Sequence, residues 1–311
     1  MVSRTDPPCS ATSAIGATDY STRVREDTYP AAVNETDLTL ADGRTLHVYD
    51  TGDAGGPTVF WHAGTPNLGT PPKPLFGAGD RLGVRWVGYD RPGYGGSTPN
   101  PGRDVASAAG DVAAIAAALR LERFAVMGSS GGGPHALACA ALLGDRVFAA
   151  ISVAGMAPFA LVTAQGLDWF AGMSDASVAS LGAATRGRAE KERFEKSGNK
   201  PEMDLTVADL RALSGEWGWF GEVVGPAMAA GPGPVIDDDL ANAGPWGFDP
   251  ADIDAPVLFL HGGQDRVVPS AHGEWLANRC PDAELRISQD EGHISVLNGG
   301  AAALEWLGKH A

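Results

Sequence analysis

A serine between glycines is the sharpest chemical signal in this sequence. The run Gly128-Ser129-Ser130-Gly131-Gly132 contains a Gly-x-Ser-x-Gly pattern centred on Ser130, between an apolar run and an alanine-rich run. A tight turn from strand to helix exposes the hydroxyl of such a serine at the helix N-terminus, where developing negative charge is favoured. Ser130 is therefore the predicted nucleophile. Ser129 fits less well because Met127 stands two residues before it. A phosphate-binding loop is the alternative, but the Lys-Ser/Thr pair of a P-loop is absent.

A serine hydroxyl needs a base within hydrogen-bond reach, and histidine titrates in a suitable range. Among seven histidines, His293 stands out because Asp290-Glu-Gly-His293 falls between the last predicted strand and the last predicted helix. That position is at the end of the sheet from which the serine turn emerges. His62, in the loop after the third predicted strand, is the rival base, whereas His261 at a strand end is expected to be packed.

The histidine in turn needs a carboxylate that fixes its tautomer and stabilises its cation. Asp265 follows the penultimate predicted strand in His261-Gly-Gly-Gln-Asp265. The chain order Ser130, Asp265, His293 is one of the known orders of a Ser-His-Asp triad. We therefore predict that these three residues form a catalytic triad.

Acyl transfer also needs two N–H donors for the oxyanion. Gly131, the residue after the nucleophile, supplies one. The second is expected in the loop His62-Ala63-Gly64-Thr65-Pro66, where Thr65 is the first choice and Gly64 the alternative, because Pro66 has no N–H.

The elements that must position these groups are short apolar strands that alternate with helical segments from Thr36 onward. This alternation predicts a mostly parallel sheet with helices on both faces. The Asp42-Gly43 pair predicts a hairpin turn between the first two strands. The expected strands are 36–40, 45–49, 57–61, 85–89, 124–127, 147–153, 257–260 and 283–287, and the expected helices between them are 105–119, 134–143 and 294–307.

Residues 158–245 interrupt this rhythm with a segment that lacks strand patterns. We interpret it as a helical cap inserted into a core formed by residues 34–157 and 246–311. Within it, Trp217, Trp219 and Phe220 are predicted to line an acyl pocket, although aromatic residues of a helical segment also serve as plain core. The polar residues 1–33 are predicted to form a flexible tail without the apolar region of a signal peptide.

Composition excludes several classes of function. The chain has 23 Lys and Arg against 38 Asp and Glu, a formal charge of −15, which argues against binding nucleic acid or an anionic membrane. No apolar run approaches the roughly 18 residues of a membrane span. Three widely separated cysteines form neither a metal knuckle nor an obvious disulfide framework, which favours the cytoplasm. A small-molecule substrate is the expected partner, and no metal or cofactor is expected.

These motifs, together with Tyr89-Asp-Arg-Pro-Gly-Tyr-Gly-Gly-Ser97, resemble the α/β-hydrolase superfamily. The resemblance runs from about Thr36 to the C-terminus and is strongest to the capped branch that includes esterases, proline iminopeptidases and non-haem haloperoxidases. It implies an α/β fold with a mostly parallel eight-stranded sheet, helices on both faces and an inserted helical cap. The chain departs from the usual His-Gly loop at His62-Ala63-Gly64, and it lacks the tryptophan that follows the nucleophile in proline iminopeptidases.

The function predicted from the sequence is hydrolysis of a carboxylic ester, lactone or amide of a small to medium apolar acyl compound through an acyl-enzyme. A proline-iminopeptidase-like aminopeptidase is the first alternative, for which Glu216 and Glu222 are the available cap carboxylates. A lyase or perhydrolase would keep the same triad. A small-molecule receptor of the same fold, without catalysis, is the alternative from another class.

Overall fold

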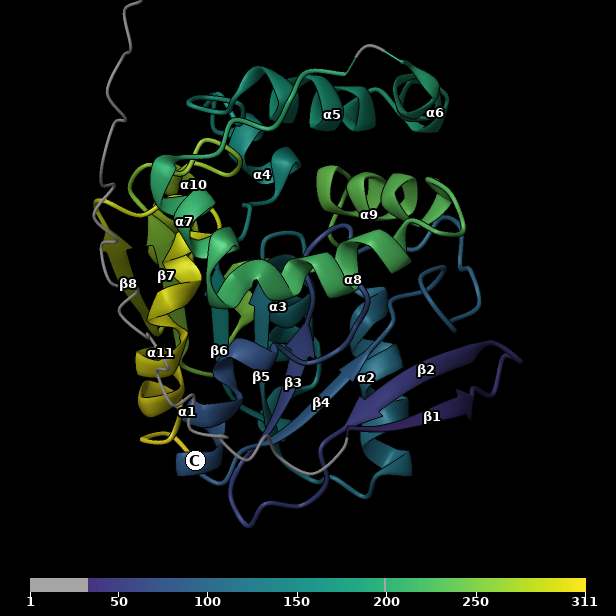
Figure 1. The fold of residues 1–311 in the computed structure, drawn as a ribbon, viewed down its shortest axis with the longest axis vertical. Helices are drawn as coiled ribbons and strands as arrows, with labels where there is room; N and C mark the ends of the chain where they lie inside the picture. Colours follow the sequence, from purple (N-terminus) through teal and green to yellow (C-terminus); the bar gives the residue numbers. More distant parts are fainter. Residues whose placement is uncertain (1–32, 199) are drawn as a thin grey trace, which may run out of the picture.

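The computed structural model describes residues 33–198 and 200–311, so the predicted tail lies outside the described residues except for Val33. One eight-stranded sheet runs through the middle of the molecule in the order β1-β2-β4-β3-β5-β6-β7-β8 (Figure 1). Strand β2 is antiparallel to β1 and to β4, and the pairs from β4 to β8 are parallel. The strands are β1 (Asn34–Thr39), β2 (Thr45–Asp50), β3 (Thr58–His62), β4 (Arg85–Tyr89), β5 (Phe124–Ser129), β6 (Val147–Val153), β7 (Val257–Gly262) and β8 (Ala283–Ser288).

Helices cover both faces of this sheet because successive residues of its buried strands point in opposite directions. On one face, Phe60, Val126 and Phe259 belong to the same apolar cluster as residues of the helices α2 (Ser107–Ala118), α3 (Gly132–Leu142) and α10 (Ser270–Arg279). On the other face, Trp61 and Leu258 belong to a second cluster with α1 (Phe76–Arg81) and α11 (Gly300–Leu307). Short 3₁₀ turns η1 (Lys73–Leu75), η2 (Gly144–Arg146), η4 (Pro250–Asp252) and η5 (Ser295–Gly299) join these elements.

Every regular element described between β6 and β7 is a helix or a 3₁₀ turn. It contains α4 (Phe159–Ala164), α5 (Asp175–Thr185), α6 (Arg188–Lys196), α7 (Val207–Ser214), η3 (Glu216–Trp219), α8 (Phe220–Ala227) and α9 (Gly233–Ala243). Figure 1 shows α5, α6 and α9 above the end of the sheet where β3, β5 and β6 finish. None of the helices described is long and apolar enough to cross a bilayer.

The predicted fold class is confirmed, with shifts at element ends. Helix α10 was not expected, because Gly273 lies in its first turns and disfavours a helix. The glycine is accommodated by packing, since a Cβ at this position would lie 2.5 Å from His261 Nδ1. The helix expected over residues 294–307 is a 3₁₀ turn followed by α11, and the two meet at the pair Gly299-Gly300.

Candidate active site

The tight turn between β5 and α3 holds the backbone of Ser130 in an unusual conformation. Its φ is +52°, in the left-handed region that a non-glycine residue rarely adopts. The Ser130 N–H donates to the Val153 carbonyl at 2.8 Å, which ties the turn to β6. A Cβ on Gly128 would lie 2.2 Å from the Gly132 carbonyl oxygen, and one on Gly132 would lie 2.1 Å from that of His62. The glycines of the motif are therefore required by close backbone contacts.

Ser130, His293 and Asp265 lie in one hydrogen-bonded chain. His293 Nε2 is 2.9 Å from Ser130 Oγ, and His293 Nδ1 is 2.7 Å from Asp265 Oδ2. The other oxygen of Asp265 accepts the N–H groups of Val267 and Val268 at 2.8 and 2.9 Å. Because an ionised carboxylate can only accept hydrogen bonds, the imidazole proton belongs on Nδ1, and Nε2 is left to accept the serine proton. The loops after β5, β7 and β8 thus bring together the three residues predicted to form the triad.

Two carboxylates set the charge state of His293. Burial alone lowers its pKa, but the charge and hydrogen bond of Asp265, together with the charge of Asp209, raise the pKa above its ordinary value of 6.5. Asp209, in α7, also accepts the N–H groups of Ile294 and Ser295 at 2.8 and 2.9 Å. Its carboxylate therefore fixes the backbone directly after the histidine.

The two expected oxyanion donors lie on the same side of Ser130. Gly131 and Thr65 both border the cavity next to the serine, and a Cβ built on Gly131 would lie 2.5 Å from Thr65 Oγ1. A Cβ on Gly64 would lie 3.4 Å from the Ser130 Cβ, so the whole loop packs against the nucleophile. The structure brings Thr65 and Gly131 together, and it keeps Gly64 within the same loop as the alternative donor.

A buried cluster of charges holds this loop in place. The Arg91 guanidinium donates to the carbonyl oxygens of Ala63 and Gly64 and pairs with Asp238 of α9. Asp238 also accepts a hydrogen bond from the Thr65 hydroxyl at 2.6 Å, and it forms an ion pair with Arg103 at 2.5 Å. The side chains of Asp238, Arg91 and Arg103 are 0%, 3% and 2% exposed. Burial raises the pKa of Asp238, but the two arginines reverse this and hold it far below its ordinary value.

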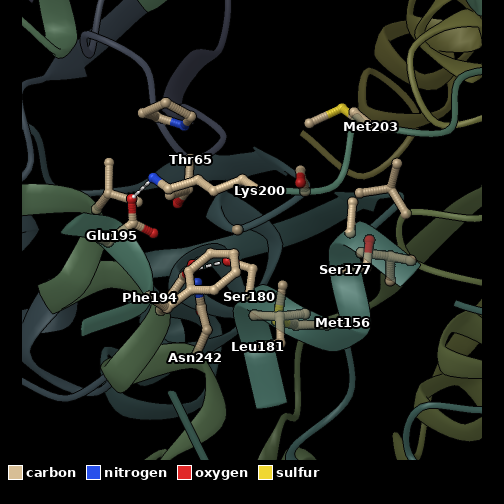
Figure 2. Close-up of a pocket in the computed structure, with 18 of the residues that line it drawn as sticks. Thr65, Met156, Ser177, Ser180, Leu181, Phe194, Glu195, Lys200, Met203 and Asn242 are labelled. Carbon is tan, nitrogen blue, oxygen red and sulfur yellow. Dashed lines mark hydrogen bonds and ion pairs between the residues drawn. The ribbon is translucent and has the colours of Figure 1, made fainter. Parts of the chain in front are cut away.

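A cavity of about 260 Å³ is lined by Ser130 and by residues of α5, α6 and α9. Figure 2 shows several of its lining side chains, among them Leu181, Phe194 and Asn242. Much of its wall is formed by apolar side chains. The apolar side chains of this wall are Met156, Leu181, Phe194, Met203, Val235, Val267 and Val268.

Charged groups of α6, α9 and the chain after α6 are paired with one another beside the cavity. Lys191 is fully buried and contacts Asp239 at 2.5 Å and Glu195 at 2.7 Å. Lys200 contacts the other oxygen of Glu195 at 2.5 Å, the ion pair visible in Figure 2. Burial raises the pKa of Glu195, but its hydrogen bonds to both lysines outweigh this and lower it. Two cations thus face two carboxylates.

The aromatic cluster predicted to line the acyl pocket does not border this cavity. Trp217 and Trp219 are 1% and 6% exposed, and Phe220 packs with them in the apolar cluster on the α1 and α11 face of the sheet. Trp217 Nε1 donates to Asn298 Oδ1 at 3.0 Å, which secures it against η5. The prediction is wrong, because residues of α5, α6 and α9 line the cavity, whereas the three aromatic residues pack against the core.

Other candidate residues lie outside the site. His62 is buried with Nε2 3.6 Å from Cys139 Sγ, and burial holds its pKa well below the ordinary value. His261 is also buried, and its Nε2 lies 2.9 Å from the Val268 carbonyl oxygen. Glu216 is exposed and Glu222 pairs with Lys73 on the surface, so neither cap carboxylate invoked for an aminopeptidase borders the cavity.

Three residues of the site were not predicted from the sequence: Asp209, Asp238 and Asn242. The run Asp237-Asp238-Asp239 indicated a buried acid. Three successive residues of a helix point in three different directions, so at least one of these acids faces the protein when the helix is packed between other elements. The cation partners of these acids lie far away in the chain, so the pairing itself left no local mark.

A sequence model described as the alpha/beta hydrolase fold matches residues 57–300, most of the chain. The chain belongs to the α/β-hydrolase fold family. It is 30% identical over 258 residues to a non-heme chloroperoxidase of Streptomyces lividans, covering 78% of this chain and 88% of the relative. It is 29% identical over 232 residues to the dihydrolipoyllysine-residue acetyltransferase component of the acetoin cleaving system of Cupriavidus necator.

That match covers 72% of this chain and 55% of the acetyltransferase component, so this α/β-hydrolase-fold chain spans about half the length of that relative. Among solved structures, a thermophilic esterase from Thermogutta terrifontis has a TM-score of 0.62 and 22% identity, covering 90% of this chain and 100% of the esterase. At this identity the likeness concerns the fold alone.

Proposed function

We propose that this protein is a serine hydrolase that cleaves carboxylic esters of small to medium, largely apolar acyl compounds through an acyl-enzyme. The observation that carries the proposal is the hydrogen-bonded chain from Ser130 through His293 to Asp265 beside an apolar cavity. The family and its chloroperoxidase relative support an enzyme of the hydrolase type in general.

The geometry supports two successive acyl transfers. In the first, Ser130 Oγ attacks the ester carbonyl while its proton passes to His293 Nε2, and the N–H groups of Thr65 and Gly131 stabilise the oxyanion. His293 then gives this proton to the leaving alcohol as the bond to it breaks. In the second transfer, His293 takes a proton from water as the water attacks the acyl-enzyme, and it returns this proton to Ser130 Oγ as the acid leaves. Asp265 stabilises the imidazolium in both.

The experiment that tests this proposal is replacement of the nucleophile. Ser130→Ala is expected to abolish covalent labelling by a fluorophosphonate probe and to lower kcat on p-nitrophenyl butanoate by several orders of magnitude. Ser129→Ala is the matched control, because the neighbouring hydroxyl has no contact with His293 and its loss leaves labelling intact. Stoichiometric labelling of the Ser130→Ala protein would contradict the assignment.

The chloroperoxidase relative favours a second candidate, perhydrolysis, in which hydrogen peroxide replaces water as the acceptor of the acyl group. The same acyl-enzyme would then yield a peracid. Ester turnover in the presence of peroxide, with the peracid measured by its oxidation of a dye, separates the candidates. A peracid yield no greater than that of the uncatalysed mixture favours the hydrolase.

A further inference from the structure

An asparagine amide without a partner borders the cavity above Ser130. Asn242 lies in the last turn of α9 and its side chain is fully buried (Figure 2). Neither its Nδ2 nor its Oδ1 has a hydrogen-bond partner among residues 33–198 and 200–311. Buried polar side-chain atoms are in most cases paired, so an unpaired amide on a cavity wall indicates a partner that a ligand supplies.

The position of this amide places its ligand close to the reacting carbonyl. A Cβ built on Gly131 would lie 3.1 Å from Asn242 Nδ2. Gly131 is one of the two expected oxyanion donors, so the amide lies next to that residue at the Ser130 end of the cavity. A substrate group that meets Asn242 is therefore attached within a few atoms of the carbonyl carbon.

The remaining polar groups of the cavity define the charge of that substrate group. Lys191 and Lys200 are matched by Asp239 and Glu195, so this set leaves no cation or anion unpaired for a charged ligand. The Ser180 hydroxyl already contacts Lys191 at 2.6 Å and Asp239 at 3.2 Å. Unmet hydrogen-bonding capacity at this wall is thus concentrated in a neutral amide, which offers one acceptor and one pair of donors.

We propose that Asn242 selects acyl groups that carry a neutral hydrogen-bonding substituent, a hydroxyl or an amide, at the second or third carbon. This inference rests on the proposed hydrolysis at Ser130, and it adds polarity near the carbonyl to a pocket that is otherwise apolar. A hydroxyl pairs with either atom of the amide, whereas a methyl group in the same place leaves both atoms unpaired.

The test compares isosteric esters on the whole protein. The p-nitrophenyl esters of 2- and 3-hydroxybutanoic acid are paired with those of 2- and 3-methylbutanoic acid, and each kcat/KM is divided by the rate of hydroxide-catalysed hydrolysis. The wild-type protein is expected to prefer the hydroxy member of at least one pair by about tenfold or more. In Asn242→Leu, which keeps the number and branching of the side-chain heavy atoms, this preference falls to about one while turnover of the methyl ester persists.

Ser177→Ala is the matched control on the same cavity wall, because the Ser177 hydroxyl already contacts Ser174 Oγ at 3.3 Å. The hydroxy-to-methyl ratio is expected to be unchanged in it. A ratio near one in the wild-type protein, with turnover that still depends on Ser130, overturns the role of Asn242 and leaves the hydrolase proposal standing. Turnover that survives Ser130→Ala overturns the proposed function and the role of Asn242 together.

Discussion

Asp265 is the residue at which charge and geometry can be separated. Asp265→Asn keeps the shape of the side chain, but an amide no longer favours the Nδ1–H tautomer of His293 or stabilises its cation. We expect kcat to fall by roughly ten-thousandfold while the melting temperature changes little. Steady-state kinetics and thermal unfolding measure the two quantities. Near-normal turnover would assign the role to another carboxylate.

The pH dependence of turnover follows from the charge state of His293. The raised pKa means that the base becomes protonated, and the rate falls, as the pH drops through a value above 6.5. Asp209→Asn removes a charge that raises this pKa, so the acidic limb of the kcat/KM profile is expected to move to lower pH. Asp204→Asn is the control, because Asp204 pairs with Arg266 on the surface. An acidic limb at the same pH in the Asp209 variant would show that this charge does not act on the base.

At the residue scale, sequence reasoning reaches the residues that carry local motifs. Ser130 lies in a pattern that the turn itself requires, and Asp265 and His293 each follow a strand whose carboxyl end must face the same edge of the sheet. Asp238 and Asn242 follow no strand. Asp238 pairs with Thr65 and Arg91, and Asn242 lies next to Gly131. These neighbours are more than a hundred positions away, and one sequence does not encode such proximity locally.

Helix α9 is the element that connects the helical segment between β6 and β7 to the loop after β3, and its three acids allow a matched comparison. Asp238→Asn leaves Arg91 and Arg103 buried without an anion, so the free energy of unfolding is expected to drop by about 3–5 kcal/mol. Asp237→Asn on the same helix is expected to cost less than about 1 kcal/mol, because its partner Arg188 is 41% exposed. Urea unfolding measures both variants. Equal losses would contradict the central role of Asp238.

Elements were predictable in buried strands such as β5 and β6, and also in the exposed strand β1, which the Asp42-Gly43 turn joins to β2. The eight strands appear within a few residues of their expected ends, because apolar strands between glycine and proline turns leave little choice. The aromatic cluster at Trp217 was assigned to the pocket because composition cannot tell which side of a helix faces a cavity. That distinction depends on how the helices between β6 and β7 pack on the sheet. Their boundary as a separate cap stays a prediction.

Across the whole molecule, buried histidines make stability depend on pH. Burial lowers the pKa of His135 to about 3 and that of His272 to about 4, so both are neutral in the folded state at pH 5. The unfolded chain binds a proton at each below about pH 6.5. Proton uptake therefore stabilises the unfolded state as the pH falls below 6.5. At pH 5, each of these histidines lowers the free energy of unfolding by about 2 kcal/mol relative to its value above pH 6.5.

The raised pKa values of His47 and His293 act in the opposite direction and reduce the net change. Urea unfolding at pH 5 and pH 7.5 measures it. His135→Gln and His272→Gln, which cannot take up a proton, are each expected to flatten the difference. A free energy of unfolding that is higher at pH 5 than at pH 7.5 would contradict this account.

The buried charge cluster around Asp238 also bears on how such a protein can change over evolution. Segments inserted after β6 would be exchangeable units if they only rested on the sheet, and a new one would bring a new specificity at once. Here one member of the cluster comes from the inserted segment and its two cations come from loops of the core. A transplanted segment without an acid at that position would leave two buried arginines without an anion beside the loop after β3. Recombination of this chain with its relatives is therefore restricted to donors that bring a matching carboxylate, and specificity is more readily altered by substitutions on the cavity wall.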